Sequence, residues 1–358
     1  MDKKKIKFSI IMPAYGVDQT IRDSIEAILH QTYLEWELII VNDASKDKSA
    51  EIAEGYAANN SKIKVLHHKQ NQGVAAARNT GIDAACGDYI LFFDAGDTVE
   101  KNLLETIYSK LYDHLSDVVV FGCKEEYYKA SGELSHAVSH SLVTEYSEDL
   151  NTIHRRVMEL NKETLYGYPW NKAYKARILK DNSIHFENYP FGEDILFNIE
   201  FFDYVSSMTI LSDELYHYVN YLSDSKDRLT TKYLPEYFEY QKKRMNGLYS
   251  QQERWNTLDE KAKEALSAEY FRSFLSMMER EYHHGPSKQK ILERAQHETK
   301  EVLYHSLNRY VPKDNKTFQF LYQPLADGEF EKAYRRMKLV SFVRHHFGGL
   351  FAKAKQMR

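Results

Sequence analysis

The sequence predicts an α/β fold with a mostly parallel central sheet, followed by a helical C-terminal region. Short apolar runs alternate with helical patterns over about the first 120 residues, as in parallel strands joined by right-handed crossovers. The alternation stops after Cys123, and from about residue 235 onward apolar residues recur at helical spacing. At 358 residues the chain is long enough for about two domains.

The elements of the α/β part can be placed in order. Strands are expected at residues 8–12, 38–41, 63–66, 89–93 and 118–121, each a short apolar run. Helices are expected between them, at residues 20–30, 49–58, 73–85 and 103–115. The predicted domains are residues 1–230, the α/β domain; 231–331, the helical region; and 332–358, a basic amphipathic tail.

Composition narrows the class of protein. The net charge of −4 provides no basic field for nucleic acid. The two cysteines, Cys86 and Cys123, lie in or beside apolar runs, which favours reduced cysteines in a cytoplasmic protein. The first apolar run is too short for a signal peptide, and no uninterrupted apolar run is long enough to span a bilayer.

Charged side chains follow three of the predicted strands. Asp43 follows the second, Arg78 lies in the helix after the third, and Asp94 and Asp97 follow the fourth. These loops share one edge of a parallel sheet, where ligands collect. The set suits a nucleoside diphosphate, with Asp43 at the base, Arg78 at ribose or phosphate, and the carboxylate pair on a divalent metal. Alternatively, each acid caps a turn or helix, and Arg78 is a surface residue.

Other nucleotide-binding folds are excluded by their motifs. The first strand ends in Pro13-Ala14-Tyr15-Gly16 rather than in Gly-x-Gly-x-x-Gly. This departure argues against a nicotinamide site. The sequence also has no P-loop motif, which argues against a P-loop enzyme, and no Cys-x-x-Cys or His-Glu-x-x-His, which argues against a built-in zinc site.

Several blocks of sequence occur in the order found in one enzyme family. They are residues 9–15, 41–47, 71–81 and 93–97, then Trp170-Asn171-Lys172 and Gly192-Glu193-Asp194. Over about residues 6–222 the chain resembles family 2 glycosyltransferases with the GT-A fold. The resemblance implies inverting transfer from a nucleotide sugar, most often a UDP-sugar, usually with Mg²⁺ or Mn²⁺.

The resemblance also implies roles on the donor side. Arg78 would approach the nucleotide, and His217 occupies the place of a donor-phosphate or metal contact. The base would be surrounded by Pro13, Ala14, Tyr15 and Asp43. Asp94 would lie at the ribose and the metal, and Asp97 would be the main metal ligand. Gly96 departs from the common Asp-x-Asp-Asp pattern, so either Asp97 takes over with a shell of waters or metal binding is weak.

On the acceptor side, Asp194 is the candidate general base, because inversion needs a carboxylate to take the proton of the attacking hydroxyl. Glu193 would orient a substrate hydroxyl or pair with a cation, and Trp170 would offer an apolar face to a sugar. Three alternatives remain open. The two acids simply begin a helix, Trp170 belongs to the core, and His217 is a strand residue that faces solvent.

The C-terminal tail has no Asp or Glu, and Val340, Val343, Phe347 and Phe351 share one helical face. This pattern fits a helix lying on an anionic membrane, or one docked on its own chain or on a second copy in a homo-oligomer. The expected protein is a cytoplasmic, peripherally membrane-bound glycosyltransferase that builds a cell-surface glycan on a glycan or lipid-linked acceptor. The alternatives are transfer of another nucleotide-activated group and a non-catalytic binding or assembly subunit.

Overall fold

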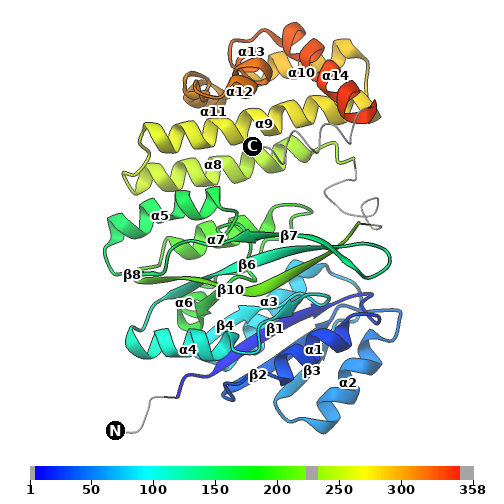
Figure 1. The fold of residues 1–358 in the computed structure, drawn as a ribbon, viewed down its shortest axis with the longest axis vertical. Helices are drawn as coiled ribbons and strands as arrows, with labels where there is room; N and C mark the ends of the chain where they lie inside the picture. Colours follow the sequence, from blue (N-terminus) through cyan, green and yellow to red (C-terminus); the bar gives the residue numbers. More distant parts are fainter. Residues whose placement is uncertain (1–4, 223–232, 347–358) are drawn as a thin grey trace. The chain divides into compact units, whose positions relative to one another are not determined.

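The computed structural model describes residues 5–222 and 233–346. The chain forms two compact units, Met1–Thr230 and Thr231–Arg358 (Figure 1). The first contains one mixed sheet with helices on it, and in the second every described element is a helix.

Among the described residues, the sheet of the first unit has ten strands. Its main path runs β3-β2-β1-β4-β9-β6-β10-β5, with β7 paired to β6 and β8 paired to β10. Neighbours are parallel in β3-β2-β1-β4 and in β6-β10, and antiparallel elsewhere. The strands are β1 (Phe8–Ala14), β2 (Trp36–Asn42), β3 (Ile63–His67), β4 (Tyr89–Phe92), β5 (Thr98–Val99), β6 (Val118–Tyr128), β7 (Leu134–His140), β8 (Glu145–Ser147), β9 (Lys172–Lys175) and β10 (Met208–Tyr221).

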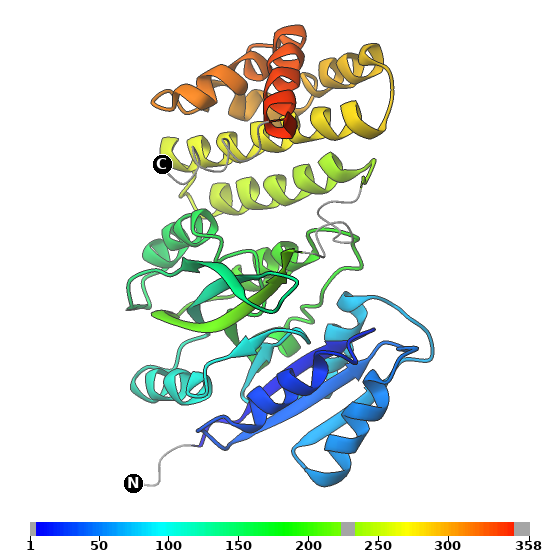
Figure 2. The ribbon, with the colours of Figure 1, turned by 45° about the vertical axis from the view of Figure 1, so that its right-hand side comes forward.

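The helices of this unit cover both faces of the sheet. They are α1 (Ile21–Leu29), α2 (Ser49–Asn59), α3 (Val74–Ala84), α4 (Leu103–Asp113), α5 (Leu150–Lys162), α6 (Ala176–Asp181) and α7 (Glu193–Phe202). Adjacent strand residues point to opposite faces. Ile11 faces Gly81 of α3, where an added Cβ would lie 2.3 Å from the Ile11 side chain, whereas Ile10 clusters with Ile28 of α1 and Leu103 of α4. Figure 2 shows α1 and α2 in front of β1 and β2.

The predicted α/β fold is confirmed, and each strand and helix expected up to residue 121 is present. Their ends are shifted by at most two residues, except that β6 continues to Tyr128 instead of ending at residue 121. The strand order after β4 differs from a simple parallel continuation. β9 lies between β4 and β6 and is antiparallel to both. Its sequence, Lys-Ala-Tyr-Lys, has no apolar run that would mark a strand, although Lys172 and Tyr174 are fully buried.

The second unit is built from helices whose apolar faces form its core. These are α8 (Tyr237–Arg254), α9 (Glu260–His284), α10 (Lys288–Glu298), α11 (Val302–Leu307), the 3₁₀ helix η2 (Asn308–Tyr310), α12 (Lys316–Leu321), α13 (Gln323–Ala326) and α14 (Phe330–His346). Aromatic rings provide much of the packing, with Phe274 in contact with Phe238, Tyr270 and Phe330. Burying such rings contributes roughly 1.5–3 kcal/mol each.

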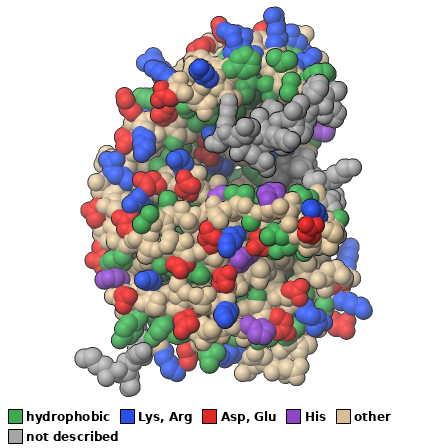
Figure 3. All heavy atoms as spheres, viewed as in Figure 1, with side chains coloured by type: hydrophobic (Ala, Val, Ile, Leu, Met, Phe, Trp, Pro, Cys, Tyr) green, Lys and Arg blue, Asp and Glu red, His purple; other side chains and the backbone are tan. Residues whose placement is uncertain are grey.

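The predicted tail from residue 332 begins inside α14. Ala333, Tyr334 and Met337 are buried within the second unit, which favours the alternative of a helix docked on its own chain. Residues 347–358, with Phe347 and Phe351, lie outside the described residues. In the part of the chain that the structure describes, no helix has the length and apolar character needed to cross a bilayer. On the face seen in Figure 3, basic and acidic side chains are interspersed.

Candidate nucleotide-sugar site

The polar residues predicted for the donor side lie where strands β1, β2 and β4 end. These strands are parallel and adjacent, so their carboxyl ends open at one edge of the sheet. At the end of β1, Pro13 is half-buried, Ala14 is 2% exposed and Tyr15 is 51% exposed. Of these three side chains, Tyr15 is the one placed to contact a ligand.

Asp43, at the end of β2, is 3% exposed and already has partners on both carboxylate oxygens. Gln72 N donates to Oδ1 at 2.9 Å and Gly73 N donates to Oδ2 at 2.8 Å. The Nδ1 of His68 lies 2.7 Å from Oδ1. Asp43 therefore fastens β2 to the loop before α3. Nothing in the sequence marks His68 as the partner of Asp43.

The two acids after β4 occupy different environments. Asp94 has a side chain that is 32% exposed. Asp97 is 6% exposed, and its oxygens accept hydrogen bonds from Tyr216 Oη at 2.6 Å and Val219 N at 2.9 Å, both on β10. Burial and the charge of Asp94 raise the pKa of Asp97 to about 8, against these two hydrogen bonds. Asp97 therefore links the loop after β4 to β10.

The predicted metal ligands Asp94, Asp97 and His217 do not come together as a set. Both oxygens of Asp97 face β10, and the ring nitrogens of His217 lie 2.8 Å from Glu126 and 3.1 Å from Glu100. Within residues 5–222 and 233–346, no three or more His, Cys, Asp or Glu side chains are arranged to hold a metal ion. Of the three side chains, that of Asp94 is the most exposed, at 32%, and both of its oxygens accept from Arg78.

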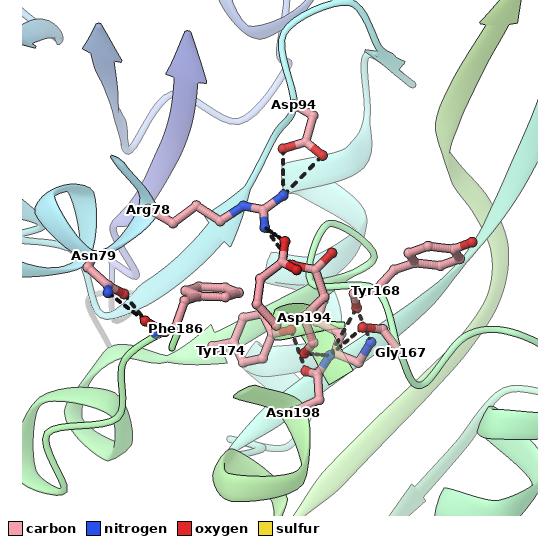
Figure 4. A network of polar contacts seen from close by, with 11 residues as sticks. Arg78, Asn79, Asp94, Gly167, Tyr168, Tyr174, Phe186, Asp194 and Asn198 are labelled. Atoms are coloured by element: carbon pink, nitrogen blue, oxygen red, sulfur yellow. Dashed lines mark hydrogen bonds and ion pairs between the residues drawn. The ribbon is translucent and has the colours of Figure 1, made fainter. Parts of the chain in front are cut away.

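Arg78 is the centre of the charged network (Figure 4). Its side chain is 4% exposed. Nη2 donates to both oxygens of Asp94 at 3.0 and 3.2 Å, and Nη1 donates to Asp194 Oδ1 at 2.5 Å. The guanidinium also lies over the ring of Phe186, 5.2 Å from its centroid. One cation thus joins the end of β4 to the start of α7, which are about a hundred residues apart in the sequence.

The charge state of Arg78 follows from these neighbours. Burial alone would lower its pKa, but Asp194, Asp94 and Glu193 raise it, so it remains a cation. Its buried Nε–H has no hydrogen-bond partner among the described residues. An unmet buried donor costs about 1–3 kcal/mol.

Asp194 and Glu193 form the first turn of α7. Gly192 precedes them in the left-handed conformation, with φ +87°, and the acids stabilise the positive end of the helix. The Asp194 side chain is 26% exposed, and Glu193 Oε1 lies 3.8 Å from Arg78 Nη1. Burial raises the pKa of Asp194, as do Glu193 and Asp94, while Arg78 opposes the shift. Such a carboxylate is suited to accepting a proton near neutral pH.

Trp170 does not present a free ring face to a sugar. It is 3% exposed, and its ring is stacked on Tyr168, Tyr216 and Tyr218 at centroid distances of 4.7, 4.4 and 5.7 Å. Its position favours the alternative that it belongs to the core. Each aromatic pair contributes about 0.5–1.5 kcal/mol beyond the area it buries.

Several residues that hold the site together were missed by the sequence analysis. Tyr216 connects Asp97 with Asp94, since its hydroxyl also accepts from Asp94 N at 3.2 Å. Asn79 pairs through its amide with both backbone groups of Phe186, which holds that ring beneath Arg78. Asn79 follows Arg78 directly and Tyr216 precedes His217, but nothing in their spacing signals these contacts.

Comparison with known proteins bears on the family and the fold. Residues 9–182, just under half of the chain, match the model of glycosyl transferase family 2. The chain is 32% identical over 211 residues to the uncharacterized glycosyltransferase EpsJ of Bacillus subtilis, covering 59% of this chain and 60% of EpsJ. It is 28% identical over 217 residues to the poly(ribitol-phosphate) beta-N-acetylglucosaminyltransferase TarS of Staphylococcus aureus, covering 60% of this chain and 35% of TarS.

The similarity to solved structures covers residues of both units. TarS residues 1–349 in complex with UDP-GlcNAc match with a TM-score of 0.66 and 18% identity, covering 93% of this chain and 91% of that one. At this identity the match shows the fold, which confirms the predicted GT-A domain followed by a helical region. The chain spans less than two thirds of the length of EpsJ and TarS.

Proposed function

We propose that the protein is an inverting glycosyltransferase that moves a sugar from a nucleoside-diphosphate donor, a UDP-sugar, to a hydroxyl group. The observation that carries this proposal is the bridge made by Arg78 between Asp94 and Asp194. It brings an acid at the ligand-binding edge of the sheet into the same cluster as an acid with a raised pKa.

Asp194 acts as general base in this proposal. Its carboxylate takes the proton of the acceptor hydroxyl while that oxygen attacks the anomeric carbon from the side opposite the diphosphate. The bond between the anomeric carbon and the diphosphate oxygen breaks, and the nucleoside diphosphate leaves with the electron pair. Glu193 lies beside Asp194 and pairs with Arg78, so it holds the cluster or a substrate hydroxyl.

On the donor side, Tyr15 is the exposed side chain at the end of β1 and is proposed to lie against the base. Pro13, Ala14 and Asp43 form the wall behind it, and Asp43 acts through the loop that it fastens. Arg78, which donates to Asp94, is proposed to approach the nucleotide. For a divalent cation, Asp94 is the residue that fits, and the cation would offset the charge of the diphosphate.

The acceptor is proposed to be a cell-surface glycan or a lipid-linked precursor, as the names of relatives such as TarS suggest. A cytoplasmic protein at the inner face of the membrane would meet both substrates. The proposed membrane contact rests on the basic face of α14, where Arg335, Lys338, Leu339 and Phe342 are exposed.

Nucleotide release tests the proposal. The purified protein is incubated with a panel of UDP-sugars and with GDP- and CDP-activated sugars, each with Mn²⁺ or Mg²⁺. Release of UDP from one UDP-sugar, with a thermal shift on adding UDP, is the expected result. If no donor is cleaved and no nucleotide shifts the unfolding temperature, the alternative of a non-catalytic assembly subunit replaces the proposal.

A further inference from the structure

Strand β9 carries two fully buried polar side chains on one face. Lys172 and Tyr174 are two residues apart, and both are 0% exposed. Lys172 Nζ donates to the carbonyls of Leu165 at 2.7 Å and Tyr168 at 2.5 Å, and to Asn171 Oδ1 at 2.8 Å. All three donors of the ammonium group are therefore used on the segment between α5 and β9.

Asn198 connects that segment to α7. Its Nδ2 donates to the carbonyls of Gly167 at 3.0 Å and Asp194 at 3.1 Å, with a longer contact of 3.4 Å to Tyr168. Its Oδ1 accepts from Tyr174 Oη at 2.7 Å. Figure 4 shows Asn198 beneath Asp194, directed at Tyr174 on one side and at Gly167 and Tyr168 on the other. We name Lys172, Tyr174 and Asn198 the α7 clamp.

The first turn of α7 needs such support. Its N-cap is Gly192, which has no side chain to accept a hydrogen bond from the free N–H groups of the helix. A serine or aspartate there would anchor the turn. Instead, the position of Asp194 depends on Arg78 at its carboxylate and on Asn198 at its carbonyl.

Lys172 holds the segment between α5 and β9 at a cost in stability, because burial of a charged ammonium group is unfavourable. Burial lowers the pKa of Lys172, and the nearby Cys123 and Asp194 oppose that shift. A fully satisfied polar network gives a single rigid arrangement that apolar packing gives less reliably. This network lies next to Asp194, the residue proposed as general base, so its rigidity would fix the position of that residue.

We propose that the α7 clamp is a positioning device for Asp194. It holds the first turn of α7 so that the carboxylate meets the acceptor hydroxyl at reacting distance. Lys172 and Tyr174 are positioning residues that touch neither substrate, and this role rests on the transfer reaction proposed above.

Two conservative variants test the clamp. Tyr174→Phe removes only the hydroxyl that holds Asn198, and Lys172→Met removes the ammonium group but keeps the length of the side chain. Lys175→Met is the matched control, because this lysine is on the same strand but pairs with Asp117 at 2.9 Å. The readouts are hydrogen exchange of backbone amides in residues 193–198, the dissociation constant of UDP by calorimetry, and the rate of UDP release from the donor that the wild type cleaves.

Faster exchange at residues 193–198 is expected in both test variants, with the control unchanged. The kcat for UDP release should fall about 10- to 100-fold, since small misplacements of catalytic groups have effects of that size, while the dissociation constant of UDP stays within about twofold. The double variant should be no slower than the slower single variant, because the two residues act as a unit.

If hydrogen exchange at residues 193–198 is unchanged in Tyr174→Phe, the proposal is wrong. It is also wrong if the affinity for UDP falls as much as kcat does. If Lys172→Met does not fold, Tyr174→Phe decides alone. A wild type that cleaves no donor refutes the proposed function instead, and the exchange data then still decide whether the clamp holds α7.

Discussion

Asp194 and Asp97 are both acids at the ligand-binding edge of the sheet, but the structure uses them differently. Asp97 is 6% exposed, and its two oxygens are taken by the hydroxyl of Tyr216 and the amide of Val219. Asp194 keeps a quarter of its side chain exposed, and its carboxylate is held by the cation of Arg78. The first is bound to strand β10, and the second is bound by a side chain of α3 and stays partly exposed.

The difference shows what a sequence motif cannot distinguish. Both acids follow the pattern of the family, and both have a raised pKa with burial as the largest cause. Their partners decide the role. A carboxylate whose oxygens accept from fixed donors of the fold stabilises that fold. For a carboxylate held by a single side-chain cation, as Asp194 is, we propose a role in the reaction.

The largest expected effect is that of Asp194→Asn, which tests the proposed role of the more exposed of the two acids. The amide cannot accept the hydroxyl proton, so sugar transfer should fall about 10²- to 10⁴-fold, while UDP binding stays unchanged by calorimetry. Glu200→Gln, an exposed position on the same helix, serves as the control and should keep full activity. Full transfer by Asp194→Asn would show that another group is the base.

Arg78→Met tests whether one cation holds the cluster. The change leaves Asp94, Glu193 and Asp194 facing one another without a counter-charge. Because a broken buried ion pair costs about 3–5 kcal/mol, and the two bonded acids keep some contact with solvent, we expect a loss of about 3 kcal/mol in urea unfolding. The double variant Arg78→Met/Asp194→Asn should recover part of it, and equal stability of wild type and Arg78→Met would contradict the central role of Arg78.

The α/β fold could be predicted because the strands up to residue 121 are apolar runs that alternate with helical patterns. The family could be predicted because blocks such as residues 93–97 resemble its motifs. The position of β9 could not, since Lys172 and Tyr174 are buried through hydrogen bonds rather than through apolar character. The contacts among the predicted site residues could not be predicted either. Neither the Tyr216–Asp97 bond nor the Arg78–Asp194 bond follows from spacing, because each joins segments more than a hundred residues apart.

Asp97→Ala tests whether the buried acid of the pair stabilises the fold rather than binding a metal. It leaves the Tyr216 hydroxyl and the Val219 amide without their acceptor, so unfolding free energy should fall by about 1–3 kcal/mol. Mn²⁺ binding, followed by electron paramagnetic resonance, should match that of the wild type, while Asp94→Asn weakens it. Loss of Mn²⁺ binding in Asp97→Ala, with none in Asp94→Asn, would restore Asp97 as the metal ligand.

The smallest expected effect concerns Asp117, a third acid that sharpens the comparison. Like Asp97 it is 6% exposed and met by fixed donors, here Ser206, Ser207 and the cation of Lys175. Burial raises its pKa, but the hydrogen bonds from Ser206 and Lys175 outweigh burial, and the net shift is downward.

A pKa below that of the unfolded chain means that the Asp117 carboxylate stabilises the fold above about pH 4 and loses this effect as pH falls through the folded-state value. The stability difference between wild type and Asp117→Asn, measured by urea unfolding, should therefore be largest near pH 7 and shrink toward pH 3. If the stability difference instead grows as the pH falls, the fold holds Asp117 as the neutral acid. Lys175 would then not lower the pKa of Asp117, and Asp117 would resemble Asp97, whose pKa is raised.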